Sequence, residues 1–161
     1  MPNPPSIRFL LAHPAHLLAC GFGSGLSPWA PGTVGTLFAW ASFPLLRHWM
    51  SDFELLGFLF VCFLGGVIVV HKTGVDLGVS DHGSIVWDEI VPFWIVLLLT
   101  PTGILWQAVA FALFRFFDIV KPQPARYFDQ HVKNGFGVMA DDAVAAGYTL
   151  LVVAALKALL G

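Results

Sequence analysis

The chain has 161 residues, of which 57% are hydrophobic and only 11% are charged, with a formal net charge of −2. Its mean hydropathy is +0.79. A soluble domain of this length could not bury so much apolar surface, so the composition favours a membrane protein and gives no indication of nucleic-acid binding. The length predicts one domain over residues 1–161. Cys20 and Cys62 lie in apolar segments and indicate neither a disulfide framework nor a metal site.

The N-terminal segment, residues 1–20, is rich in proline and weakly amphipathic. Arg8 is the only basic residue before a short apolar stretch that Pro14 interrupts, which is unlike a cleavable signal peptide. We expect a short helix at the membrane interface. Residues 21–36 are then predicted to form a loop rich in Gly and Pro. This loop could be a plain connector, or its glycines could bring backbone N–H groups close to an anion.

Four or five membrane-embedded helices are predicted after this loop. They cover approximately residues 34–48, 55–70, 84–100, 104–120 and 141–160. Some of their apolar stretches are too short to cross about 30 Å of hydrocarbon. We therefore expect their polar ends to lie in the headgroup layer, where they could form a site at the membrane surface.

The distribution of basic residues predicts the orientation. If each helix crosses the bilayer, the loops near residues 71–84 and 121–140 lie on the same side as the N-terminus. Most basic residues lie on that side: Arg8, Lys72, Arg115, Lys121, Arg126 and Lys133. The positive-inside rule then predicts that this side is cytoplasmic. Every polar motif of the chain lies on the same side, so the site is expected to face the cytoplasm.

Two adjacent acids, Asp88 and Glu89, precede the apolar run at residues 93–99. A carboxylate inside a membrane helix costs about 2.5 kcal/mol or more, so this pair needs a partner or a function. Hard carboxylate oxygens suit Mg²⁺, which often binds one or two carboxylates together with substrate phosphate. A second acidic pair, Asp141 and Asp142, is predicted to open the last helix. It could be an ordinary N-cap or part of the same metal site.

A third polar group occupies one helical stripe, because Arg115, Asp118 and Lys121 are spaced three residues apart. The three charges could neutralise one another. Alternatively, the two cations hold phosphate oxygens and Asp118 binds a metal or orients the substrate. Arg126 continues this polar segment.

His82, just before the third predicted helix, is the best-placed candidate for a proton donor to a leaving alkoxide, although a surface histidine without a role fits as well. The chain has neither the G-x-S-x-G pattern of serine hydrolases nor a C-x5-R phosphatase loop. Serine or cysteine nucleophiles are therefore not supported.

Four segments, in this order and spacing, resemble the bacterial phosphatidylglycerophosphatase A family. They are residues 23–33 (GSGLSPWAPGT), 81–89 (DHGSIVWDE), 114–122 (FRFFDIVKP) and 135–142 (GFGVMADD). The resemblance covers nearly the whole chain. It implies an all-α, polytopic membrane fold and a Mg²⁺-dependent enzyme of the bacterial inner membrane. This enzyme removes the terminal phosphate of phosphatidylglycerol phosphate.

The resemblance also suggests roles for individual residues. The expected metal ligands are Asp88, Glu89, Asp141 and Asp142. The expected catalytic residues are Asp88, Glu89, Asp118, Arg115, Lys121 and His82. The expected substrate-binding residues are Ser24, Ser27, Thr33, Arg115, Lys121 and Arg126. Pro92 and Phe136 stand where the family pattern has glycine, which affects backbone geometry more than chemistry.

Two other classes of protein fit parts of the sequence. A small transporter or proton-coupled carrier would use intramembrane acids to relay ions, but it would place them near the middle of the bilayer. A non-catalytic lipid-binding subunit would keep the basic residues and would have little need for four acids. A CDP-alcohol phosphotransferase would need a spaced Asp-Gly-Ala-Arg signature, which the sequence lacks. The sequence does not predict an oligomeric state.

Overall fold

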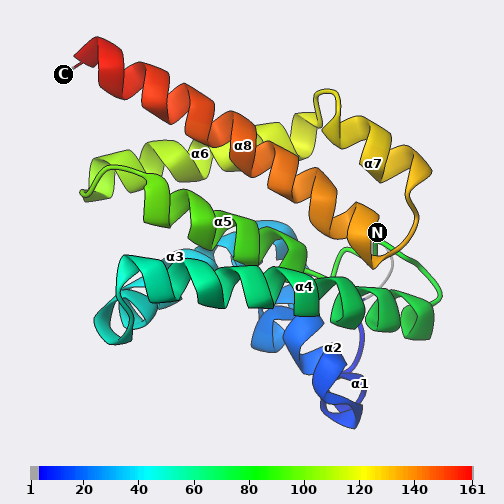
Figure 1. The fold of residues 1–161 in the computed structure, drawn as a ribbon. Coiled ribbons are helices and arrows are strands. Elements are labelled where there is room, and N and C mark those ends of the chain that lie inside the picture. The colour runs from blue at the N-terminus through cyan, green and yellow to red at the C-terminus, as the bar shows by residue number, and fades with distance from the viewer. Residues whose placement is uncertain (1–3, 161) are drawn as a thin grey trace.

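A computed structural model of the chain describes residues 4–160, and this part is helical without any strand. The described part contains eight α-helices and one short 3-10 helix, and Figure 1 shows how the α-helices are arranged. In chain order they are α1 Ile7–Ala12, α2 Pro14–Ala19, the 3-10 helix Gly21–Leu26, α3 Pro31–Trp49, α4 Asp52–Leu77, α5 Trp87–Leu99, α6 Ile104–Val120, α7 Ala125–His131 and α8 Gly135–Leu160. The expectation of an all-α fold is confirmed.

Each of the five long helices matches a predicted one, and their ends have local causes. The predicted range 104–120 is that of α6. Helix α3 begins three residues early because Pro31 at its first position is pre-organised for a helix. Helix α4 is longer than expected because Ser51 and Glu54 form a capping box at its start and Gly78 ends it in a left-handed conformation.

The start of the last helix differs from the prediction. Helix α8 begins at Gly135, six residues before Asp141, because the Asn134 side chain accepts a hydrogen bond from the Gly137 N–H at 3.0 Å. Asp141 and Asp142 therefore lie about two turns into the helix, and reading them as an N-cap was wrong. Their burial needs another explanation.

Two segments contain more helix than expected: the N-terminal segment, where one short helix was predicted, and residues 21–36, which were predicted to form a loop. The N-terminal segment forms two short helices, and His13 caps the second of them with its side chain. His16 of α2 bonds Asp76 of α4 at 2.6 Å, which fastens this part to the body. The predicted loop at 21–36 contains the 3-10 helix and the first turns of α3, and α7 lies between α6 and α8.

The long helices alternate in direction. As a result α3, α5 and α8 begin, and α4 and α6 end, at one end of the molecule, which we call the site end (Figure 1). Helix α5 is the central element and packs against α3, α4 and α8. Nine of its 13 residues are buried, and the Trp94 indole donates a hydrogen bond to the Ala39 carbonyl at 2.9 Å.

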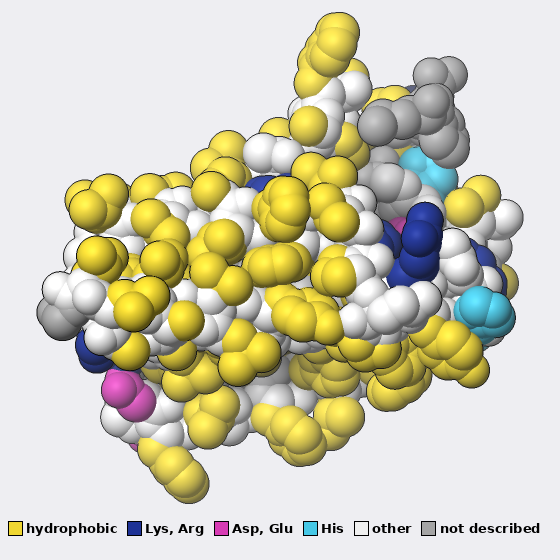
Figure 2. Space-filling view, turned by 90° about the horizontal axis from the view of Figure 1, so that it is seen from above, with side chains coloured by type: hydrophobic (Ala, Val, Ile, Leu, Met, Phe, Trp, Pro, Cys, Tyr) yellow, Lys and Arg dark blue, Asp and Glu magenta, His cyan; other side chains and the backbone are white. Residues whose placement is uncertain are grey.

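Two helices, α4 and α8, are long and apolar enough to span a bilayer. In a soluble protein such helices would form the core, yet only 22% of the most apolar 18-residue window of each is buried. Side chains along α4 such as Phe60, Leu64 and Ile68 are more than half exposed. Figure 2 shows a surface covered with hydrophobic side chains, with the charged ones gathered towards its ends. This surface is suited to contact with lipid.

Helix α8 lies so close to α4 that Gly135 has no room for a side chain. A Cβ there would come within 2.0 Å of the Val67 carbonyl oxygen, whereas a Cβ at Gly147 of the same helix would meet open space. We expect Gly135→Ala to destabilise the protein by about 2 kcal/mol, the usual cost of overpacking. Thermal unfolding in detergent measures this effect.

Gly147→Ala is the matched control and should leave the melting temperature unchanged or raise it, because alanine favours helix. Equal melting temperatures for the two variants would contradict the close packing of α4 and α8.

Candidate active site

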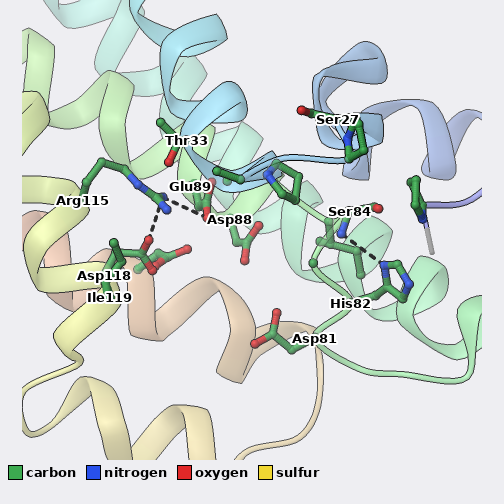
Figure 3. Close-up of a pocket in the computed structure, with 18 of the residues that line it drawn as sticks. Ser27, Thr33, Asp81, His82, Ser84, Asp88, Glu89, Arg115, Asp118 and Ile119 are labelled. Carbon is green, nitrogen blue, oxygen red and sulfur yellow. Dashed lines mark hydrogen bonds and ion pairs between the residues drawn. The ribbon is translucent and has the colours of Figure 1, made fainter. Parts of the chain in front are cut away.

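A cavity of about 450 Å³ lies at the site end. Its walls come from the turn before α3 and the first residues of α3, from the loop between α4 and α5, from the first turn of α5, from the end of α6 and from Asp142 of α8. Segments far apart in the sequence thus meet here, and most of the charged residues singled out from the sequence lie in or beside the cavity (Figure 3).

The first turn of α5 is held against the N-terminal segment. Val86, just before the helix, donates its N–H to the Ala19 carbonyl at 2.9 Å. Three glycines allow this close packing, because a Cβ at Gly25 would meet the Ser84 carbonyl oxygen at 2.1 Å and a Cβ at Gly21 or Gly35 would meet Val86. Glycines of the Gly/Pro-rich segment therefore permit the close packing of this segment against the start of α5.

Gly32 explains where Glu89 lies. A Cβ at Gly32 would come within 2.1 Å of a Glu89 carboxylate oxygen, so this carboxylate occupies the space that a side chain would take. Asp88, the preceding residue, is 5% exposed and also lines the cavity. Both acids stand in the first turn of α5, where the helix dipole favours negative charge.

Arg115 of α6 joins three elements. One of its guanidinium nitrogens lies 3.1 Å from a Glu89 oxygen and 2.7 Å from an Asp118 oxygen (Figure 3). The same nitrogen donates to the Thr36 hydroxyl of α3 at 3.4 Å. The Arg115 Nε atom is buried without a hydrogen-bond partner within residues 4–160. Arg115 therefore keeps a donor that no residue of the described part uses.

Three carboxylates converge beside this arginine. Ligand oxygens of Glu89, Asp118 and Asp142 lie within 4.8 Å of one another, in an arrangement that could hold a metal ion. Glu89 Oε2 and Asp88 Oδ1 are buried and have no hydrogen-bond partner in the described part of the chain. Buried oxygens of this kind are costly unless a cation or a proton satisfies them.

Lys121 pairs with Asp141, the acid of α8 that is not among the three convergent carboxylates. Its ammonium group lies 2.5 Å from Asp141 and 2.9 Å from Asp129. Burial opposes the charged form, but these two carboxylates outweigh it and raise the pKa of Lys121 above that of a free lysine. Lys121 also takes a left-handed backbone conformation, with φ 47°, at the end of α6. It is therefore a permanent cation whose partners are already in place.

The charges of this region do not balance. Five carboxylates, those of Asp88, Glu89, Asp118, Asp141 and Asp142, are buried or nearly so. Two cations, Arg115 and Lys121, lie among them, which leaves three negative charges uncompensated within the described chain. A divalent cation bound by the three convergent carboxylates would remove most of this imbalance, and all-oxygen ligands of this type suit a hard ion.

Some of the other predicted site residues line the cavity and some do not. Ser27, Thr33 and His82 line the cavity, whereas Ser24 and Arg126 do not. Ser24 and Ser27 both donate their hydroxyls to backbone carbonyls, of Gly21 and Trp29. His82 is buried, accepts the Ser84 N–H at 3.1 Å, and lies apart from the carboxylates in Figure 3. Their roles stay predictions.

Two residues that shape the site were not singled out from the sequence. Thr36 contacts Arg115, and Gly32 leaves the space for Glu89. Thr36 follows Gly32 by four residues, and its hydroxyl donates to the Gly32 carbonyl at 2.9 Å. The only signal for them was the density of small residues at the start of α3, which does not identify a particular contact.

Comparisons with known proteins identify a family for this chain. The family model described as Phosphatidylglycerophosphatase A matches residues 17–157. A Haemophilus influenzae protein named phosphatidylglycerophosphatase A is 50% identical over 157 residues, which is 96% of each chain. The Escherichia coli protein of the same name is 47% identical over 141 residues, covering 86% of this chain and 80% of the relative.

A third relative, from Bacteroides thetaiotaomicron, is 38% identical over 152 residues and covers 90% of this chain and 94% of the relative. It carries the provisional name of a phosphatidylinositol-3-phosphatase. No solved structure matches the chain significantly.

Metal binding at the three carboxylates can be measured without any assay of activity. A ligand at 100 times its dissociation constant stabilises the folded state by about 2.7 kcal/mol. We therefore expect Mg²⁺ or Mn²⁺ to raise the melting temperature of the purified protein. Asp118→Asn and Glu89→Gln should remove this increase. Asp81→Asn, a change of an exposed acid at the cavity rim, should retain it, and equal behaviour of all three variants would contradict the assigned ligands.

Proposed function

Because the chain belongs to the phosphatidylglycerophosphatase A family, we propose that it hydrolyses phosphatidylglycerol phosphate to phosphatidylglycerol and inorganic phosphate in bacterial phospholipid synthesis. The observation that carries the proposal is the set of convergent carboxylates beside a buried arginine with a free donor. This combination suits a phosphomonoester, whose oxygens need positive charge and donors. The third relative suggests that other lipid phosphates are worth testing as substrates.

We infer that the cation is Mg²⁺ and that Glu89, Asp118 and Asp142 hold it. The fit is supported by the oxygen ligands and by the unpartnered Glu89 oxygen. Bound there, Mg²⁺ would polarise the phosphoryl group and neutralise its negative charge. Arg115 holds Glu89 and Asp118 in place with one nitrogen and offers its free Nε to a phosphate oxygen.

Asp88 is the acid left for the chemistry itself. Its Oδ1 is unpartnered at the cavity, so it can accept the proton of an attacking water molecule or attack phosphorus directly. With Asp88 as base, the water oxygen bonds to phosphorus, the bond from phosphorus to the glycerol oxygen breaks, and that oxygen takes up the proton that Asp88 removed from water. With Asp88 as nucleophile, the same bond breaks as an aspartyl phosphate forms, and a water molecule then hydrolyses this intermediate to inorganic phosphate and supplies the proton. Lys121 holds Asp141 and Asp129 and so fixes the end of α6 against α8.

The expected membrane placement is that of a multi-pass inner-membrane protein. Trp29 and Trp49 are exposed at opposite ends of α3, a helix of 19 residues and therefore about 28 Å long. This length is close to the thickness of the hydrocarbon layer, and exposed tryptophans favour its two interfaces. Thr33, at the cavity, follows Trp29 by four residues, which supports a position of the carboxylates near the headgroups.

The basic residues support the cytoplasmic orientation of this end. Lys72, Lys121 and Lys133 belong to segments at the site end, as the positive-inside rule requires of the cytoplasmic face. A carrier would place its acids near the middle of the bilayer and open them to both sides. The clustering of the acids at one end gives that alternative less support.

The direct test is phosphate release from purified protein in detergent micelles containing phosphatidylglycerol phosphate. We expect Asp88→Asn to lower kcat at least about a hundredfold, the lower range for loss of a general base. The melting temperature of the variant should stay near that of the unmodified protein. Asp52→Asn, at the far end of the molecule, is the control and should keep full activity. Near-normal turnover by Asp88→Asn would overturn the role of Asp88.

Removal of divalent cations tests the proposed cofactor. EDTA should abolish phosphate release, and added Mg²⁺ should restore it, because the carboxylates need the ion to accept an anionic substrate. Ca²⁺ serves as the comparison ion because it prefers longer and more flexible coordination. Full activity in EDTA would contradict a metal-dependent reaction.

A further inference from the structure

The cavity has a side that faces away from water, between the start of α3 and the end of α6. Below the cavity these two helices contact each other. Trp40 of α3 donates to the Gln107 side chain of α6 at 2.8 Å and stacks on Phe111 with a ring separation of 5.5 Å. Within residues 4–160, the hydrogen bond between Arg115 and Thr36 is the contact of this antiparallel seam that lies nearest the site end, one turn beyond Trp40. The seam is therefore closed up to the floor of the cavity.

Beyond Thr36 the two helices border the cavity without a hydrogen bond, ion pair or aromatic contact between them within residues 4–160. Gly32 and Thr33 stand on the α3 side, and Asp118 and Ile119 stand on the α6 side. In Figure 3 Thr33 and Ile119 lie on either side of the Arg115 side chain. Gly32 contributes no side chain here, and the Glu89 carboxylate takes the space beside it.

Ile119 shows that the cavity wall formed by the end of α6 is only one side chain thick. Its side chain lines the cavity and yet the residue is 71% exposed, whereas Asp118, the preceding residue, is 9% exposed. One residue of α6 thus belongs to the carboxylate cluster and the next belongs to the outer surface. The cavity reaches the outside of the helical bundle at Ile119.

The surface around this gap is apolar on both helices. Leu37, one turn beyond Thr33 on α3, is 45% exposed, and Phe116, one turn before Ile119 on α6, is 56% exposed. Helix α3 carries no charged residue before Arg47. In the membrane placement proposed above, these side chains contact the acyl region next to the headgroup layer.

We propose that the lipid substrate reaches the carboxylates sideways from the bilayer, through the gap between Thr33 and Ile119, and that its acyl chains remain outside along the α3–α6 seam. This inference rests on the proposed function and adds the path of the substrate. The same proposal assigns the side of the cavity lined by Pro28, Asp81 and Gly83 to water and inorganic phosphate. Ile119 and Leu37 then contact the acyl chains of lipid substrates and take no part in the chemistry.

The test compares two substrates that differ only in their acyl chains. One is dioleoyl phosphatidylglycerol phosphate in phosphatidylcholine vesicles, and the other is a dibutanoyl analogue dissolved as monomers. Ile119→Gln should lower kcat/KM for the vesicle substrate roughly tenfold, the scale of a lost apolar contact, while that for the soluble analogue stays unchanged. Leu37→Gln, on the α3 side of the gap, should show the same selective loss.

Two controls separate this effect from a general cost of polar residues in lipid. Val75→Gln changes a 65% exposed residue near the site end of α4, away from the gap, and should leave both substrates unaffected. Ile119→Leu should keep activity on both. The inference is overturned if Ile119→Gln and Leu37→Gln affect the two substrates equally, whether by losing both or by losing neither. If the unmodified protein releases phosphate from neither substrate, the proposed function fails and the path fails with it.

Discussion

The unequal number of buried negative and positive charges is the constraint on which this structure depends. Five carboxylates meet two cations at one end of a helical bundle, and two of the carboxylate oxygens have no partner in the described chain. Burying charge without compensation is among the most costly features a fold can have. The fold tolerates this cost here for two reasons. The N-terminus of α5 and the Arg115 guanidinium offset part of the negative charge. The arrangement also leaves room for a cation and for the anion that this cation binds.

The sequence was sufficient to predict the long helices, but not how the charged residues near the cavity are paired. Apolar runs indicated the five long helices, and the adjacent acids were recognisable because charge is rare in this chain. The pairing depends on contacts across elements. Gly32 leaves the space that Glu89 occupies, and Arg115 joins Glu89 to Asp118, whereas Lys121 takes Asp141. The early start of α8 depended on one side-chain bond from Asn134, which spacing alone does not reveal.

The same arrangement connects the chemistry to the membrane. Because α3, α5 and α8 begin where α4 and α6 end, all polar motifs collect at one end, and the remaining surface is free to be apolar. A site of this kind needs no deep channel. Asp118 and Ile119 are adjacent in sequence, yet one belongs to the carboxylate cluster and the other to the outer surface. A lipid substrate could therefore keep its acyl chains in the bilayer beside Ile119 while its phosphate reaches the carboxylate of Asp118.

The central claim is that Glu89, Asp118 and Asp142 hold the divalent cation. Crystals of the protein grown with Mn²⁺ test it most directly, because anomalous scattering locates this ion independently of the protein phases. The claim predicts a peak among these three side chains, about 2.2 Å from an oxygen of each, the usual range for such ions. A peak between Asp129 and Asp141, with none at Glu89, would contradict it.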